Sequence, residues 1–304
     1  MGKTRIEWTK FSWNPFHGCT KISDGCKYCY AERMARRLAG RFGYPEYPHH
    51  FDVVMREDRM NEPATWKEPR MVFVGSMGDL FHEDVETWFI LSIFHVMAGN
   101  SQHTFQVLTK RPERMYNILK RYEPAKNIWL GVTAENQKAA DERIPILLET
   151  PATVRFVSCE PLLGWLDPTD ISLGNYRYLN ALNGHISKLN KSGTGYAHER
   201  KTNHLNLVID GGETGPNARP SHPDWFRQIR DECVEAGVPY FHKHNGEWLS
   251  MNGSEAALAG PHCTMTSDGS VPNSLNPRTA WMVHVGKRKA GHLLDGKEWR
   301  QMPD

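Results

Sequence analysis

Short apolar runs alternate with helical patterns through most of the 304-residue chain, and polar residues follow almost every run. This alternation predicts a parallel sheet, because parallel strands need long crossover connections and are buried on both faces. Six or seven such units favour a complete or partial (β/α) barrel over an open doubly wound sheet. The predicted strands lie just before Gly18 and at residues 71–74, 104–108, 127–132, 154–157, 205–209 and 239–242.

Helical patterns connect these strands. Predicted helices cover residues 30–38 and 85–97. The helices that follow the strands at 104–108 and 127–132 end near residues 121 and 148. The last helix passes through Trp225, Ile229 and Cys233, and Cys233 lies on its apolar face with Phe226 and Ile229. The fold class that we predict is therefore α/β, with about six to seven parallel strands.

Two segments do not follow this alternation of predicted strands and helices. Residues 170–204 are poor in apolar side chains, which predicts a long inserted loop, and such loops are often functional. Residues 249–304 carry Gly, Asn and Ser clusters and a turn signal, which predict a small β-rich appendage. We therefore expect a barrel domain over residues 1–248, with the insertion at about 170–204, and a C-terminal extension over 249–304.

Composition limits the class of protein. Hydrophobic residues make up 39% and charged residues 24% of the chain, as in ordinary soluble globular proteins. No apolar run approaches the roughly 20 residues that a membrane span needs, and the N-terminus lacks the apolar stretch of a secretory signal. We expect a cytoplasmic protein. A net charge of +2 argues against a broad phosphate-binding surface but leaves room for a local basic track.

Three of the six cysteines lie within eleven residues, spaced C-x6-C-x2-C at Cys19, Cys26 and Cys29. Thiolates gathered this closely suit zinc or an iron–sulfur cluster better than oxygen-preferring ions. A structural zinc site needs a fourth ligand, which His17 or a more distant histidine would supply. A 4Fe-4S cluster on three cysteines would leave one iron open to a small chelating molecule. Free buried thiols are the third alternative.

Polar residues follow the predicted strands at the end where a parallel barrel places its working residues. The cysteine loop follows the first strand, so it would open on the same face. Loops are polar in any protein, and no single position decides between the two explanations. The residues concerned are Ser76, Asp79, Lys110, Arg111, Thr133 to Asn136, Ser158 to Glu160 and Asp210 to Glu213.

The cysteine spacing, with Tyr28 before the last cysteine and Tyr30 after it, resembles that of a radical SAM enzyme, although C-x3-C-x2-C is more common in that superfamily. Further segments carry a closer resemblance: IEW at 6–8, WNP at 13–15, SMGDLFHE at 76–83, VLTKRP at 107–112, CEPL at 159–162 and GGE at 211–213. Over roughly residues 4–250 and the C-terminal hairpin, the chain resembles the phage Gp37/Gp68 family, known as DUF5131.

The resemblance implies that the three cysteines hold a 4Fe-4S cluster whose open iron is chelated by S-adenosylmethionine. One electron from the reduced cluster would cleave the sulfonium C–S bond, and the resulting 5′-deoxyadenosyl radical would abstract a substrate hydrogen atom. Flavodoxin or ferredoxin would serve as electron donor. By analogy the substrate is a modified thymine or another nucleobase in phage DNA, changed by an isomerase or lyase reaction in the host cytoplasm.

Two alternatives remain open at this point. The enzyme could act on a peptide or a small metabolite, or the chain could be a non-enzymatic, zinc-binding nucleic-acid module. A possible backbone-binding strip in the insertion would serve a nucleic acid, although a solvated loop explains its charges equally well. The strip consists of Lys188, Lys191, Arg200 and Lys201.

The resemblance also implies roles for residues that contact the cofactor. The methionine amino group would be contacted by Ser76, Gly78 and Asp79. Lys110 would bind the methionine carboxylate, unless it is only a solvent-exposed surface lysine. Gly211, Gly212 and Glu213 would approach the adenine or the substrate, since glycines permit close backbone approach. Glu135 and Asn136 would bind the ribose hydroxyls, with a helix N-cap as the alternative for Asn136.

The candidate catalytic residues are Glu160 and Cys159. Glu160 could act on the substrate or form a salt bridge, and Cys159 could donate hydrogen or belong to the core. The neighbouring pair His262 and Cys263 is too small a set of ligands to indicate a second metal.

Overall fold

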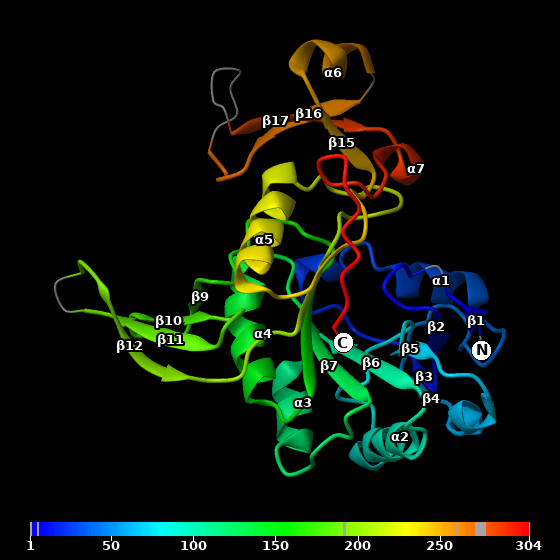
Figure 1. Cartoon of the computed structure of the whole chain (residues 1–304). Helices are drawn as coiled ribbons and strands as arrows, with labels where there is room; N and C mark the ends of the chain where they lie inside the picture. Colours follow the sequence, from blue (N-terminus) through cyan, green and yellow to red (C-terminus); the bar gives the residue numbers. More distant parts are fainter. Residues whose placement is uncertain (1, 5, 191–192, 260, 271–277, 304) are drawn as a thin grey trace. The chain divides into compact units, whose positions relative to one another are not determined.

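The computed structural model describes residues 2–4, 6–190, 193–259, 261–270 and 278–303 (Figure 1). The chain divides into two compact units. The first unit consists of residues 1–133 and 146–156, and the second of residues 134–145 and 157–304. The domain boundary that we expect near residue 248 stays a prediction.

Five sheet strands lie in the first unit, in the order β1-β2-β5-β6-β7. β1 pairs with β2 antiparallel, and the other neighbours pair in parallel. All six positions of β7 are buried, which is typical of a parallel strand covered on both faces. The bounds are β1 Gly2–Lys3, β2 Phe11–Trp13, β5 Met71–Val74, β6 Thr104–Thr109 and β7 Ile128–Thr133.

Three helices accompany these strands in the first unit. α1 (Tyr30–Leu38) begins directly after Cys29, its N-cap, as the helical pattern predicts. α2 (Thr87–Gly99) buries an apolar face, and α3 (Pro112–Leu119) starts on a proline, which fits the first turn of a helix. Short elements precede β5. The strand predicted just before Gly18 is β3 Phe16–His17, but it pairs antiparallel with β4 Val54–Met55 and does not belong to the parallel sheet. The 3-10 turns η2 Glu57–Arg59 and η3 Glu62–Thr65 follow β4.

The second unit continues the α/β pattern with the strand order β8-β13-β14. β8 (Val154–Cys159) contributes residues to both units, and β13 (Leu207–Asp210) pairs in parallel with β14 (Tyr240–His242). α4 (Gln137–Glu149) precedes β8, and α5 (Pro223–Ala236) lies between the last two strands in sequence. The fold is therefore mixed α/β. Its parallel strands match the number predicted for a partial barrel.

The insertion is folded, so the predicted loop at residues 170–204 was wrong. Four antiparallel strands occupy it in the order β12-β11-β10-β9 (Figure 1). Its few apolar residues, including Leu179 and Ile186, alternate along the strands and are buried on one face. Low apolar content concealed this alternation. The bounds are β9 Ile171–Ser172, β10 Arg177–Asn180, β11 His185–Leu189 and β12 Tyr196–Lys201.

The C-terminal segment contains the predicted β structure as a three-stranded antiparallel sheet, in the order β15-β17-β16. No helix in the described ranges is both long and apolar enough to cross a membrane. The bounds are β15 Trp248–Met251, α6 Gly253–Ala259, β16 His262–Thr266, β17 Thr279–His284 and α7 Lys287–Ala290.

Candidate functional site

The cysteine loop lies between β3 and α1 in the first unit. Cys19 comes two residues after β3, Cys26 ends the short 3-10 turn η1 (Asp24–Cys26), and Cys29 is the N-cap of α1. All three thiols are half-buried and none is in a disulfide. The loop therefore presents three free sulfur donors from one short piece of chain.

A glycine contact fixes the start of this loop to the end of β5. The Gly18 amide donates to the Met77 carbonyl at 3.0 Å, and Gly18 forms an isolated parallel bridge with Gly78. A Cβ atom on Gly18 would lie 2.1 Å from the Asp52 carbonyl oxygen, and one on Gly78 would lie 2.6 Å from the Gly18 carbonyl oxygen. Only glycine permits this approach, so both glycines hold the cysteine loop against the strand end.

Asp79 joins the ends of β5 and β6. Its Oδ1 accepts hydrogen bonds from the Thr109 hydroxyl at 2.7 Å and the Phe81 amide at 3.0 Å. Its Oδ2 accepts from the Lys110 amide at 3.0 Å and from Arg111 Nη1 at 3.4 Å. The Asp79 side chain and its partner Arg111 are both about nine-tenths buried. The carboxylate is thus fully engaged with protein donors.

Arg111 connects this carboxylate to the cysteine loop. Its Nη1 donates to Cys19 Sγ at 3.4 Å, and its Nη2 donates to the Thr20 hydroxyl at 2.8 Å. His82 Nε2 lies 2.9 Å from the same hydroxyl, while His82 Nδ1 accepts from the Asp84 amide. Nε2 therefore carries the proton and donates to Thr20. Burial, together with the charge of Arg111, lowers the pKa of His82 and keeps its ring neutral.

Two of the thiols differ in acidity. Burial raises the pKa of Cys19 to about 11, and the negative charge of Asp79 adds to the effect while Arg111 opposes it. Burial also acts to raise the pKa of Cys26, but backbone hydrogen bonds at Ile22 and Ser23, with the charge of Lys110, hold that pKa below its usual value. Cys26 therefore forms a thiolate more readily than Cys19.

The donor chemistry of the loop fits an iron–sulfur cluster. Three free thiols are soft ligands, and the cations Lys110 and Arg111 would offset part of the negative charge of bound thiolates. Among the described residues, no group of three or more His, Cys, Asp or Glu side chains is already arranged to hold a metal ion. Ser76, the remaining predicted residue of this unit, donates its hydroxyl to Asn14 Oδ1 at 3.1 Å.

In the second unit, Glu135 and Asn136 serve the start of α4. Glu135 is buried and forms an ion pair with Arg143 at 2.9 Å. Asn136 Oδ1 accepts from the Ala139 amide at 3.0 Å, which is the helix N-cap that the sequence left as an alternative. Their predicted contact with a ribose stays a prediction.

Glu160 lies at the end of β8 with two polar partners. The Ser158 hydroxyl donates to Glu160 Oε2 at 3.2 Å, and Lys243 Nζ lies 3.0 Å from Oε1. This is the salt bridge that the sequence left open for Glu160, and sequence reasoning missed Lys243. Cys159 is fully buried, and burial raises the pKa of its thiol well above the usual range. Its surroundings are those of a core residue.

The glycines after β13 pack closely against other residues of the second unit. A Cβ atom on Gly212 would lie 2.5 Å from the Asn245 carbonyl oxygen, and one on Gly211 would lie 2.8 Å from Glu160 Oε1. Glu213 is buried in a two-pronged ion pair with Arg219, at 2.6 and 2.8 Å. The close approach that the glycines indicate is therefore used for packing in this part of the second unit.

Sequence reasoning also missed a buried polar network on β13 and β14. Tyr240 donates its hydroxyl to Asp210 Oδ2 at 2.7 Å, and His242 Nδ1 lies 2.7 Å from Asp210 Oδ1. His242 Nε2 faces Asn245 Oδ1 at 3.2 Å, since the Asn245 amide nitrogen donates to Ala290 and Leu293 carbonyls. Asp210 was visible as a strand-end residue, but nothing in the sequence paired it with a histidine 32 positions later.

The predicted site residues thus form two local groups, one in each unit. The first group surrounds the cysteine loop, and the second surrounds the ends of β8 and β13. The first consists of Cys19, Cys26, Cys29, Ser76, Gly78, Asp79 and Lys110, and the second of Glu135, Asn136, Cys159, Glu160, Gly211, Gly212 and Glu213.

Comparison with known proteins places the chain in a family. A family model described as "Protein of unknown function (DUF5131)" matches residues 3–303, which is nearly the whole chain. The chain belongs to the DUF5131 family. No curated protein and no solved structure matches it.

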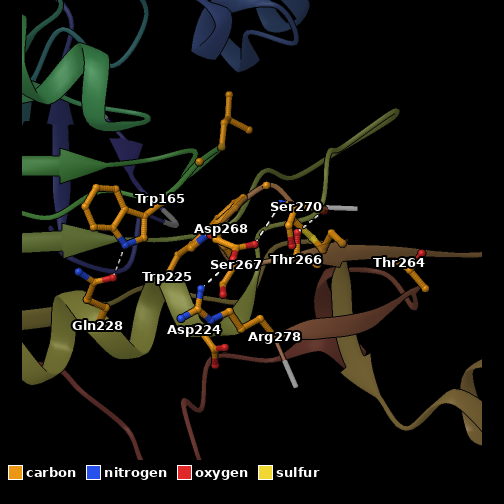
Figure 2. Close-up of a pocket in the computed structure, with 14 residues that line it drawn as sticks. Trp165, Asp224, Trp225, Gln228, Thr264, Thr266, Ser267, Asp268, Ser270 and Arg278 are labelled. Atoms are coloured by element: carbon orange, nitrogen blue, oxygen red, sulfur yellow. Dashed lines mark hydrogen bonds and ion pairs between the residues drawn. The ribbon is translucent and has the colours of Figure 1, made fainter. Parts of the chain in front are cut away.

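The DUF5131 chain also has a cavity of about 920 Å³ in its second unit, lined by none of the predicted site residues. Figure 2 shows its polar groups bonded to one another. The Trp165 indole donates to Gln228 Oε1, the Trp225 indole donates to the Ser267 carbonyl, and Arg278 pairs with Asp268. These groups satisfy each other, so the cavity offers few free partners to a ligand.

On α5, Glu232 is expected to make the stability of the DUF5131 chain depend on pH. Burial raises the pKa of Glu232 to about 8, and the charge of Asp167 raises it further against the hydrogen bond from Gln228. Because the pKa of Glu232 is higher in the folded than in the unfolded chain, its protonated carboxyl group stabilises the fold. This contribution to the free energy of unfolding is complete below about pH 4.5 and is lost as pH rises through 8.

Glu232→Gln is therefore expected to match the wild type at pH 4 and to be more stable at pH 9, by about 1 kcal/mol or more. Urea unfolding at the two pH values measures the difference. Glu235→Gln, an exposed change on the same helix, should keep the pH dependence of the wild type. The prediction would be contradicted if the free energies of unfolding of Glu232→Gln and the wild type changed with pH by the same amount.

Proposed function

We propose that this chain is a radical SAM enzyme, with a 4Fe-4S cluster on Cys19, Cys26 and Cys29 and S-adenosylmethionine as cosubstrate. The observation that carries the proposal is the loop of three free thiols, anchored at the end of β5 and bordered by two cations. Cys19, Cys26 and Cys29 would hold the cluster, which would supply one electron and an open iron for reductive cleavage of the sulfonium C–S bond.

The residues around the loop orient it in this proposal. Arg111 holds Cys19 and Thr20 at once, and its positive charge favours the thiolate. Asp79 in turn holds Arg111 and the Lys110 backbone, so we assign it a positioning role rather than direct contact with the cosubstrate. The Lys110 ammonium group would bind the cosubstrate carboxylate, because a cation and a carboxylate form a favourable ion pair.

The reaction needs a one-electron donor protein, such as flavodoxin or ferredoxin, and a substrate with an abstractable hydrogen. We propose a nucleobase as that substrate, with isomerisation or elimination as the outcome. In the second unit, Glu160 and Lys243 form a partly exposed ionisable pair, the kind of group that exchanges protons in general acid–base catalysis. Core packing argues against a catalytic role for Cys159.

Formation of 5′-deoxyadenosine tests the proposal. After anaerobic reconstitution with iron and sulfide, we expect a brown protein with broad absorbance near about 400 nm. With dithionite and S-adenosylmethionine it should release 5′-deoxyadenosine, measured by liquid chromatography. A protein that is loaded with iron and releases none would refute the proposal. A colourless protein with about one bound zinc would favour the alternative, a zinc-binding nucleic-acid module.

A further inference from the structure

The insertion carries a concentrated positive charge. Residues 171–201, which we call the arm, span β9 to β12 and contain five Lys and Arg residues against one Glu. The whole chain has a net charge of only +2, so the arm is more basic than the protein as a whole. Such a local excess is the electrostatic signature of a surface that binds a polyanion.

The register of the arm defines an outer and an inner face. Leu179 on β10 and Ile186 on β11 pair with each other and are buried, so their face lies inward. On the opposite, outer face, Ser187 lies between Tyr178 on one side and His198 on the other. Tyr196 pairs with Leu189, two residues after Ser187, and therefore joins the outer face.

Aromatic rings meet in pairs on the outer face. The Tyr178 and Tyr196 ring centroids lie 5.6 Å apart, nearly perpendicular, and Tyr196 is 62% exposed. The His185 and His198 rings lie 4.9 Å apart, and both side chains are exposed. Exposed aromatic rings on an antiparallel sheet are the platform on which single-stranded nucleic acids stack their bases.

A cation borders this face at the edge strand β12, which is exposed along its whole length. Lys201 pairs with His185 and so lies on the outer face with it, whereas Arg200 pairs with Ile186 on the inner face. The only acid of the arm, Glu199, is engaged by Arg177 at 2.7 Å. Charges alone would be explained as protection of an open edge against pairing with another strand. That explanation does not account for the paired aromatic rings.

We propose that the outer face of the arm binds single-stranded nucleic acid, with bases stacked on Tyr178 and Tyr196 and with Lys201 on a phosphate. An aromatic platform with a flanking cation favours this ligand over a protein, which would not need both. The claim that this nucleic acid is the substrate rests on the proposed function. Binding itself needs neither cluster nor cosubstrate, so an experiment can refute the binding surface and the proposed function independently.

Fluorescence anisotropy with a labelled 12-nucleotide strand tests the inference on the reconstituted full-length protein. Tyr196→Ala should weaken binding about tenfold, while Tyr196→Phe, which keeps the ring, should bind like the wild type. Lys201→Ala should lower the slope of log affinity against log salt by about 0.7, the value for one phosphate contact on a single strand. DNA and RNA strands, run in parallel, show which nucleic acid is preferred.

Lys188→Ala is the matched control, because Lys188 is an exposed lysine of the same arm that pairs with Ala197 on the inner face. Its salt slope should equal that of the wild type. The inference is overturned if the wild type binds neither strand, or if Tyr196→Ala and Lys201→Ala bind as it does. It is equally overturned if sedimentation shows that these variants change self-association instead. Binding without any 5′-deoxyadenosine formation would refute the proposed function and leave the surface in place.

Discussion

Replacing Cys19, Cys26 or Cys29 by serine is expected to reduce 5′-deoxyadenosine formation at least about a hundredfold and to remove the visible absorbance of the reconstituted protein. Serine keeps the size of the side chain but is a poor ligand for iron, so loss of any one thiol removes a third of the protein ligands. Iron and sulfide content, absorbance and product formation, measured on the same samples, separate loss of the cluster from loss of turnover.

Cys263→Ser is the control for this series, because Cys263 is also a free, half-buried thiol but lies on β16, outside the loop. It should retain iron, colour and product formation. Wild-type turnover by a Cys26→Ser protein would show that the loop is not the ligand set. Equal losses in Cys263→Ser and the loop variants would point to a general effect of thiol removal.

Replacing Asp79 by alanine is expected to lower the free energy of unfolding by about 3–5 kcal/mol. The change would leave the buried Arg111 guanidinium with only the exposed carboxylate of Glu83, at 3.2 Å, and would remove the acceptor for the Thr109 hydroxyl and two backbone amides. Urea unfolding followed by tryptophan fluorescence measures the loss. Asp79→Asn should fall between alanine and the wild type, since it keeps one acceptor oxygen.

Asp58→Ala is the surface counterpart, because Asp58 forms an exposed ion pair with Arg56 in the same unit. Solvent screens this pair, so no measurable change in stability is expected. An Asp79→Ala protein as stable as Asp58→Ala would show that the network around Arg111 does not hold the loop. Retained stability with lost iron loading would instead assign Asp79 directly to the cluster site.

Strands and helices of the parallel sheet were predictable because burial on both faces leaves uninterrupted apolar runs. The helix at residues 30–38 and the strand at 71–74 have the predicted bounds, and the bounds of the five later strands shift by only a few residues. The first strand was predicted wrongly: the strand just before Gly18 is β3, in a separate antiparallel pair, and the parallel sheet uses β2 instead. The arm was not predictable in the same way. Its strands bury a single face with few apolar residues, so composition resembled that of a loop.

Local contacts at the candidate site were partly predictable and long-range ones were not. The N-cap of α4 by Asn136 follows from neighbours in sequence. The bond from Arg111 to Cys19 joins residues 92 positions apart, and that between Asp210 and His242 joins residues 32 apart. No periodicity or spacing records such pairs, because they exist only once strands have been brought side by side.

The sequence by itself determined the α/β class, the number of parallel strands and the set of three thiols, because hydrophobic periodicity and residue chemistry are local properties. Only the tertiary structure decided that Arg111 contacts Cys19, that Asp79 is fully bonded within the protein and that the insertion is a sheet with paired outer aromatic rings. These facts depend on register and side-chain packing, which set the partner of each polar atom after the chain has folded.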